Sequence, residues 1–272
     1  MALAFGLFFM PCEAQVISVY SELSDSDVMK TLKSHVSYLA SDELGGRKAG
    51  SEGEKAAAEY VRDVFREYGV DLLSGDDGDL FGVAQQNGDT LTSRNVVGFV
   101  QGYDRAMYDK YIVIGARLDN IGTNILTVDG KPQTQIFNGA NGNASGLAVM
   151  LELARMINSN AIMFRRSVLF IAFGASEQTF AGAWYFLNRS FGDAGKIDAM
   201  IDLDMLGTGS KGFYAYTSSN ADMNMILSNV SNEIQPVLPK VTAEEPYPSD
   251  NRAFYSKEIP SVMFTTGKYP EH

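Results

Sequence analysis

Four acidic side chains lie at or just beyond the ends of short apolar runs, and they are the residues best placed to do chemistry. They are Asp119, Glu177, Asp202 and Asp204. If those runs are neighbouring parallel strands, the carboxylates meet at the edge of the sheet where α/β proteins place their sites. Grouped carboxylates can bind a divalent cation or act as acid and base. The alternative is structural, because acids at strand ends also cap helices or pair with arginine.

The sequence argues against nucleophilic and phosphate-binding sites. In the stretch 142–146 the serine stands one position too late for the strand-to-helix elbow of serine hydrolases. No histidine follows a suitable apolar run, since His35 lies in a helical pattern and His272 is the last residue. Cys12 is the one cysteine, which makes cysteine catalysis unlikely and excludes a cysteine-rich zinc motif. The run 207–211 lacks the spacing of a phosphate loop, and we interpret it as a turn.

The acids can meet only if strands and helices alternate along the chain, and the sequence pattern predicts this alternation. Apolar and β-branched runs predict strands over 95–100, 111–116, 168–173, 199–204, 213–216 and 261–266. Apolar residues at helical spacing predict helices over 27–40, 52–68, 145–157, 181–188 and 221–234. The polar segment 74–89 is expected to be an exposed excursion. This order predicts one α/β domain, a three-layer sandwich around a central mixed, largely parallel sheet.

Composition excludes several classes of partner. The chain has 272 residues, with 22 Lys and Arg against 33 Asp and Glu, and its formal net charge is −11. Binding of nucleic acid needs a basic surface, so no nucleic-acid partner is expected. No apolar run approaches the roughly 20 residues of a membrane span, and an acidic chain is not attracted to an anionic membrane surface. The oligomeric state is not determined by these properties.

Residues 1–14 have the features of a signal peptide. Residues 3–10 form an apolar block as long as the hydrophobic region of a signal, and small residues at positions 12 and 14 mark a cleavage site before Gln15. No basic residue precedes the block, and the alternative is a buried N-terminal strand or helix. With cleavage, the single mature domain 15–272 is exported to the periplasm or the cell exterior. It then has no cysteine, which suits an oxidising compartment.

From residue 38 onward the sequence resembles the co-catalytic zinc aminopeptidases. Residues 38–53, YLASDELGGRKAGSEG, are similar to the N-terminal signature of that family, which includes bacterial leucine aminopeptidases, glutamate carboxypeptidases and glutaminyl cyclases. The similarity continues in order through 93–98, 112–122, 138–153, 173–186, 200–207 and 249–267. The resemblance implies the fold of these enzymes. It also implies hydrolysis of N-terminal peptide bonds by two zinc ions that share a bridging carboxylate, with a glutamate as general base.

Several residues depart from the two-zinc pattern that the resemblance implies. Arg117 stands where the family has a histidine ligand, although Asp119, which would orient that histidine, is present. Gly142 stands at the position of the bridging aspartate and has no side chain to bridge two ions. Asn141 replaces a common acid next to it. Ser176 stands at the position of the general base, so no catalytic residue is expected to be intact.

The resemblance leaves three metal-ligand positions occupied. Glu177 and Asp204 match ligands of the family, and His272 lies close to the place of the last histidine ligand. Asn251 stands where many members have histidine, and we expect the domain to lack the family's usual C-terminal helix. Two or three ligands are at or below what one catalytic zinc ion needs. We therefore expect no cofactor, with zinc as the alternative.

The chemistry of Arg117 suggests how a cleft without metal would remain stable. Its guanidinium is always protonated and offers five donors, so it repels a cation and attracts carboxylates. Two buried carboxylates without a counter-charge would cost several kcal/mol, on the order of the penalty for any unpaired buried ion. We expect Arg117 to replace the metal charge and to pair with Asp204, and with Glu177 as a second acid. The alternative is that Arg117 points to solvent.

Three functions remain open at this point. The first is an exported aminopeptidase homologue, inactive or impaired, that binds a peptide or protein in the old cleft. The second is an active aminopeptidase with a rearranged site, in which one zinc is held by Glu177, Asp204 and His272. The third is an unrelated solute-binding or structural α/β protein, which would lack a strand-end cleft around Arg117 and Gly142.

Overall fold

The computed structural model describes residues 26–128, 130–209, 212–231 and 239–267. The predicted signal peptide 1–14 and the predicted ligand His272 lie outside these residues, so both remain predictions. Within the described residues, no helix combines the length and the hydropathy needed to cross a membrane.

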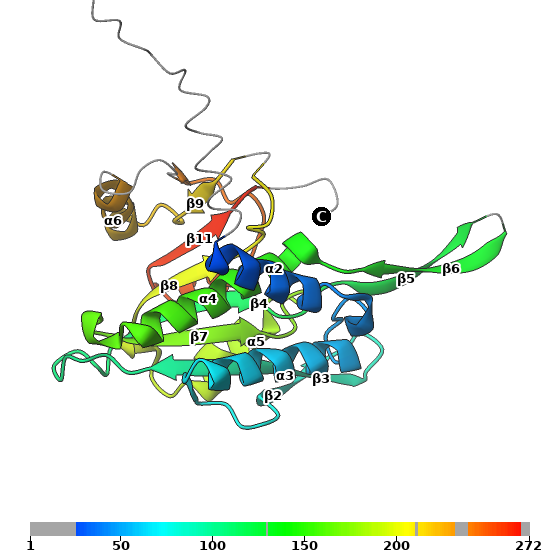
Figure 1. Cartoon of the computed structure of the whole chain (residues 1–272), viewed down its shortest axis with the longest axis horizontal. Coiled ribbons are helices and arrows are strands. Elements are labelled where there is room, and N and C mark those ends of the chain that lie inside the picture. Colours follow the sequence, from blue (N-terminus) through cyan, green and yellow to red (C-terminus); the bar gives the residue numbers. More distant parts are fainter. Residues whose placement is uncertain (1–25, 129, 210–211, 232–238, 268–272) are drawn as a thin grey trace, which may run out of the picture.

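Nine strands of the described chain form one mixed sheet through the middle of the molecule (Figure 1). The order is β1-β3-β7-β4-β8-β11-β9-β10, and β2 pairs with β3. The strands are β1 (Asp71–Leu72), β2 (Asp79–Ala84), β3 (Thr90–Val100), β4 (Tyr111–Arg117), β7 (Ser167–Phe173), β8 (Ile197–Leu203), β9 (Tyr214–Tyr216), β10 (Lys240–Thr242) and β11 (Ser261–Thr265). The adjacent strands β7, β4, β8 and β11 are parallel, so their carboxyl ends share one edge.

Helices cover both faces of this sheet and complete the predicted three-layer sandwich. On one face lie α2 (Asp27–Leu39), α3 (Glu52–Glu67) and α4 (Ser145–Ser159), and on the other α5 (Ala181–Tyr185) and α7 (Asn251–Tyr255). Ser26 and Ser51 cap the first two helices through their hydroxyl groups, as expected of serine at this position. α6 (Ala221–Ser231) packs near β9 and β11. Short helical turns are η1 (Asp42–Leu44), η2 (Ala140–Ala144), η3 (Ala161–Met163), η4 (Phe186–Ser190) and η5 (Ala194–Lys196).

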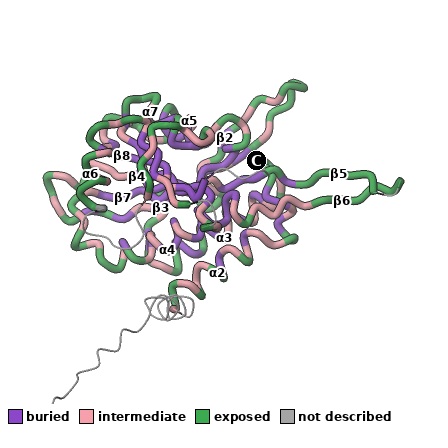
Figure 2. The backbone as a smooth tube through the Cα atoms, turned by 90° about the horizontal axis from the view of Figure 1, so that it is seen from above, coloured by how far each residue is buried: buried purple, intermediate pink, exposed green. Residues whose placement is uncertain are grey.

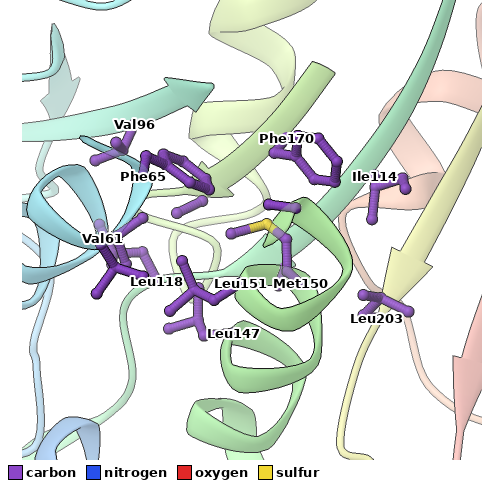
Figure 3. Packing of buried hydrophobic residues seen from close by; sticks show 14 of the residues in the cluster. Val61, Phe65, Val96, Ile114, Leu118, Leu147, Met150, Leu151, Phe170 and Leu203 are labelled. Atoms are coloured by element: carbon purple, nitrogen blue, oxygen red, sulfur yellow. The ribbon is translucent and has the colours of Figure 1, made fainter. Parts of the chain in front are cut away.

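The larger part of the core lies between the sheet and the pair α3 and α4. Phe65 of α3 and Met150 of α4 pack against Phe170 of β7 and Ile114 of β4 (Figure 3). Every residue of β7 is buried, because helices cover it on both sides. This explains why β7 and β4 were recognisable as near-continuous apolar runs. The core therefore holds the parallel strands rigidly up to the ends that carry the acids.

The sequence prediction does not include the short elements β1, β10 and α7, and two longer segments also differ from it. The expected excursion 74–89 contains strand β2, which pairs along the outer half of β3. Residues 122–137, for which no element was predicted, form the hairpin of β5 (Gly122–Val128) and β6 (Lys131–Phe137), a separate two-stranded sheet. The hairpin projects from the body, and most of its residues are exposed (Figure 2). The hairpin has no face on the core and therefore lacks the apolar alternation by which strands are recognised. β2 buries Phe81 in a small hydrophobic cluster, but a single buried residue is too short a pattern to predict a strand.

His35 is a buried pH-sensitive contact between helices. Its Nδ1 lies 2.7 Å from the hydroxyl of Tyr60, and its Nε2 lies 3.2 Å from the hydroxyl of Tyr68. Burial lowers the pKa of His35 below its ordinary value of 6.5, although the carboxylates of Glu152 and Glu67 act in the opposite direction. The unfolded chain therefore binds a proton at His35 more readily than the folded chain does.

We predict that His35 makes the fold less stable as the pH falls below about 6.5. Its contribution to stability is fully present above that pH and is lost progressively below it. A His35→Gln variant keeps a side chain able to contact both tyrosines but does not titrate. Urea unfolding at a series of pH values between 5 and 8 should show the wild-type free energy falling relative to that of the variant on the acidic side. A constant difference over this range would show that the prediction is wrong.

Candidate functional site

The residues predicted to form the site meet at the carboxyl edge of β4, β7 and β8. Arg117 is the last residue of β4, Glu177 lies in the loop after β7, and Asp204 directly follows β8. Nη1 of Arg117 lies 2.5 Å from Oε1 of Glu177, and Nη2 lies 3.3 Å from Oδ1 of Asp204. The predicted pairing of Arg117 with both acids is confirmed, and the alternative that it points to solvent is wrong.

The charge of this arginine is permanent in its surroundings. Burial alone would lower the pKa of Arg117, but the carboxylates of Asp204, Glu177 and Asp119 outweigh burial and raise the pKa above its usual value. The side chain of Asp204 is 2% exposed and that of Glu177 is 33% exposed. Arg117 therefore joins a fully buried acid to one that still reaches the surface.

Asp119 holds the loop after β7 in place. Its carboxylate accepts the backbone N–H groups of Ser176 at 2.7 Å and of Glu177 at 3.2 Å. Ala175, the residue before them, has a φ of 51°, which is a strained conformation for a residue with a side chain. Asp119 was expected to orient a histidine that this chain lacks, whereas here it orients the loop that carries Glu177.

The hydroxyl of Ser176 is already engaged. It donates to the carboxylate of Asp250, with Oγ 2.7 Å from Oδ2, and Ser176 is buried. The residue at the position of the general base therefore has no ionisable group and no free hydroxyl. Asp250 was part of a motif noted in the sequence, but nothing in its spacing indicated that it would contact Ser176, 74 residues earlier in the chain.

The surroundings of Asp204 are fixed from several sides. Ser249 donates from its hydroxyl to Oδ2 of Asp204 at 2.9 Å. Asn143 accepts the backbone N–H of Met205 at 2.9 Å and donates to the carbonyl of Leu203 at 2.8 Å. Met205 has a φ of 53°, so the chain leaves β8 through a strained turn. Strain on both sides of the Arg117 contacts is typical of a functional site.

Three predicted positions remain, namely Gly142, Asn141 and Asn251. Each of them makes a structural contact or makes no side-chain contact. Gly142 is buried in η2. Asn141 accepts the backbone N–H of Gly207 at 2.8 Å, which ties η2 to the chain after β8. Asn251 is fully buried and donates its backbone N–H to Asp202, but its side-chain amide has no hydrogen-bond partner among the described residues. An orphaned buried amide costs about 1–3 kcal/mol, and such a cost is common at functional sites.

Three further buried acids surround the arginine, and their protonation limits the negative charge. Burial raises the pKa of Asp119 to about 7. Burial, followed by the charge of Asp204, raises the pKa of Asp202 to about 7. Burial, followed by the charge of Asp202, raises the pKa of Asp250 well above its ordinary value. Near neutral pH these acids share protons, so one guanidinium does not face five full negative charges.

Arg47 supports the site, and the sequence analysis did not identify it. Its fully buried guanidinium donates to backbone carbonyls on three segments of chain, those of Leu118 at 3.2 Å, Asn138 at 2.8 Å, Gly139 at 3.1 Å, and Leu39. Burial lowers its pKa to about 10, so it stays charged at neutral pH. Arg47 lies in the Gly-rich loop 41–50 and thus links this loop to the segments before Asp119 and Gly142. A sequence does not show which backbone carbonyls will accept a hydrogen bond, since every residue has a backbone carbonyl.

A cavity of about 720 Å³ opens beside Glu177. Its walls are residues of the β2–β3 hairpin, Lys48, and the loop after β7: Ala49, Val83, Ala84, Gln85, Gln86, Asn87, Asp89, Thr90, Leu91, Glu177, Gln178 and Thr179. The volume lies in the range of small-molecule and peptide sites. Glu177 therefore stands between the ion pairs with Arg117 and an open cavity that is lined by both polar and apolar groups.

The described donors do not fit a zinc ion as they lie. Among the residues that the structure describes, no group of three or more His, Cys, Asp or Glu side chains is arranged to hold a metal ion. Glu177 and Asp204 supply two carboxylates, and both are in contact with a guanidinium. A catalytic zinc takes three protein ligands. His272 is the remaining predicted ligand and lies outside the described chain.

Residues 95–272 match the sequence model of peptidase family M28. A relative from Leptosphaeria maculans named as a probable zinc metalloprotease is 24% identical over 217 residues, which are 76% of this chain. The chain spans 47% of that relative's length, about half.

Solved structures show the same fold. A glutaminyl cyclase from Bacteroides thetaiotaomicron is 17% identical with a TM-score of 0.68, over 90% of this chain and 86% of that one. The zinc aminopeptidase BSAP from Bacillus subtilis is 18% identical with a TM-score of 0.67, over 89% of this chain and 86% of that one. These similarities confirm the α/β architecture predicted from the order of strands and helices.

We predict that Arg117→Met lowers the free energy of unfolding by about 3–5 kcal/mol, because it leaves a buried carboxylate without a counter-charge. Adding Asp204→Asn to this variant should restore part of the loss, since the buried acid then carries no charge. Arg165→Met is the matched control, because the Arg165 side chain is 59% exposed in its pair with Asp104 and such pairs are worth about 0–1 kcal/mol. Urea unfolding at pH 7 measures all three. Equal, small effects of the two arginine substitutions would contradict the prediction.

Proposed function

The chain belongs to peptidase family M28, and we propose that it is an exported member whose cleft binds the amino-terminal end of a peptide or protein without hydrolysing it through zinc. One observation carries this proposal. The guanidinium of Arg117 contacts both Glu177 and Asp204, the two acids that the sequence resemblance matches to metal ligands of the family. This fixed cation pairs with both acids without a metal ion and offsets one of their two negative charges.

The loss of hydrolysis is supported by two further positions. Ser176 stands where a general base is needed, and its hydroxyl is bound to Asp250. Loss of a general base alone costs roughly 10²–10⁴-fold in rate. Gly142 offers no carboxylate to bridge two ions. Hydrolysis by two metal ions requires such a shared ligand together with an activated water.

Peptide binding is supported by the place of Glu177. Its carboxylate is partly exposed, borders the 720 Å³ cavity and lies in a chain of net charge −11. A peptide with a free amino terminus carries an ammonium group that can pair with Oε2 of this carboxylate, since the contact with Arg117 is made by Oε1. Gln86, which also lines the cavity, offers hydrogen bonds to a peptide backbone.

Export is proposed from the apolar block 3–10 and from the small residues before Gln15. The amino-terminal sequence of the protein recovered outside a producing bacterial cell tests it, with Gln15 as the expected first residue.

The alternative function is an active aminopeptidase with one zinc ion held by Glu177, Asp204 and His272. The name of the relative from Leptosphaeria maculans as a zinc metalloprotease favours it. In this case Arg117 would have to leave both acids when the metal enters, since a guanidinium and a zinc ion repel each other at such distances.

Metal analysis of the purified protein, with an assay of aminoacyl-anilide hydrolysis, decides between the two functions. We expect less than stoichiometric zinc and no hydrolysis after incubation with zinc and removal of the excess. The triple variant Arg117→His, Gly142→Asp and Ser176→Glu restores the family's residue types and should gain zinc. Circular dichroism of the variant controls for folding. One zinc per chain with turnover in the unmodified protein, lost in His272→Ala, would establish the alternative.

We predict that a tripeptide with a free amino terminus binds more tightly than its N-acetylated form. Calorimetry on the unmodified protein measures the difference, and Glu177→Gln should remove it by weakening the free peptide about 10–100-fold, the value of a hydrogen bond to a charged group. Glu52→Gln, at an exposed position on α3, is the control and should bind as the wild type does. Equal affinity for the two peptides would show that the ammonium is not recognised.

A further inference from the structure

The hairpin of β5 and β6, residues 122–137, is an exposed surface that plays no part in the proposed cleft. We call it the β5–β6 arm. Its two strands pair over seven residues each, from Gly122 opposite Phe137 to Val128 opposite Lys131. The arm extends well away from the body in both views (Figures 1 and 2). An isolated two-stranded hairpin is at best marginally stable in water, so an arm of this length gains from a partner.

The two edges of the arm are not equivalent. The backbone N–H of Ile125 donates to Oδ1 of Asn124 at 2.9 Å and therefore faces away from β6. Because such groups alternate along a strand, the N–H groups of Thr123 and Thr127 face the same outer edge. On β6, Pro132 lies opposite Thr127 and has no N–H to offer its own outer edge. Proline and lysine are usual guards of an edge strand, and β6 begins with Lys131 and Pro132.

The exposed apolar side chains of the arm all lie on the unguarded strand. Ile125 is 70% exposed, Val128 46% and Leu126 41%. Such side chains on an open edge normally mark a strand that pairs with another. The arm therefore offers β5 as its docking edge and closes the β6 edge.

We propose that β5 pairs with β5 of a second copy of this chain, antiparallel about a two-fold axis at Ile125. In this register Ile125 lies opposite Ile125 of the second copy, and Thr123 lies opposite Thr127 of the second copy. The outer edge of β5 carries Thr123, Ile125 and Thr127, and this order of residue types is the same in both directions along the strand. The edge is therefore self-complementary. The result is a four-stranded sheet in the order β6-β5-β5-β6.

Charge allows a second copy to approach at the arm. Each copy has a net charge of −11, so two bodies repel each other at close range. Residues 122–137 contain one acid, Asp129, and one base, Lys131, so the arm is neutral as a whole. Seven paired residues at about 3.4 Å each make an arm of about 24 Å, and antiparallel pairing leaves the two bodies at opposite ends of the new sheet. The neutral arms meet while the acidic bodies stay apart.

Sedimentation of the purified chain over the micromolar range tests the proposal. We expect a concentration-dependent dimer, and we expect Ile125→Asp to weaken it at least about tenfold, because two like charges would face each other at the centre. Ile162→Asp is the matched control, since Ile162 is 85% exposed on η3 and should leave the dimer unchanged. A wild-type chain that stays monomeric, or a dimer that Ile125→Asp does not weaken, would overturn the proposal.

A disulfide across the proposed axis tests the register independently. In a chain with Cys12 replaced by serine, Ile125→Cys places two thiols directly opposite each other, at the Cα separation of about 5.5 Å that a disulfide accepts. Mild oxidation should convert most of this variant into a covalent dimer. Thr134→Cys on β6 and Ile162→Cys on η3 should react far more slowly. Equal cross-linking of all three variants would show that collision, not pairing of β5, brings the thiols together.

Discussion

The site is organised around the contacts of one guanidinium with two carboxylates. Arg117 brings a charge that no pH in the physiological range removes, and its side chain is anchored at the end of a strand whose four central residues are buried. Asp204 is buried, and a buried carboxylate is costly without such a partner. Glu177 shares the same guanidinium but reaches the surface, so the ion pairs connect the interior of the sheet to the cavity.

The scaffold that presents these groups is held by hydrogen bonds to the backbone. Asp119 holds the loop after β7, and Asn143 holds the end of β8, each through backbone hydrogen bonds. Arg47 ties together three loops through their carbonyl groups. These contacts do not depend on the identity of the side chains in the cleft. A chain can therefore replace ligands and base in this fold without losing the geometry of the strand ends.

The β5–β6 arm is linked to the same region by the chain itself. It begins shortly after Asp119 and ends shortly before Gly142, so each of its strands is continuous with a chain segment of the site. The base of the arm is held to the body, since Gly122 donates its backbone N–H to the carbonyl of Gly46 at 3.0 Å, next to Arg47. A partner bound along β5 would act on segments that are rigidly tied to the cleft. The base of the β5–β6 arm thus connects the proposed dimerisation edge to the proposed binding site.

The sequence by itself determined the order of the central strands and of the longer helices, the edge at which the acids meet and the pairing of Arg117 with them. These follow from local apolar patterns and from the rule that opposite charges in one cleft must pair. Only the tertiary structure decided the roles of Arg47 and of Asp250, because their partners are backbone carbonyls or lie some 70 residues away in the chain. It also decided that residues 122–137 form a projecting hairpin. A strand with no face on the core carries no apolar alternation, so its existence is settled by backbone pairing and not by burial.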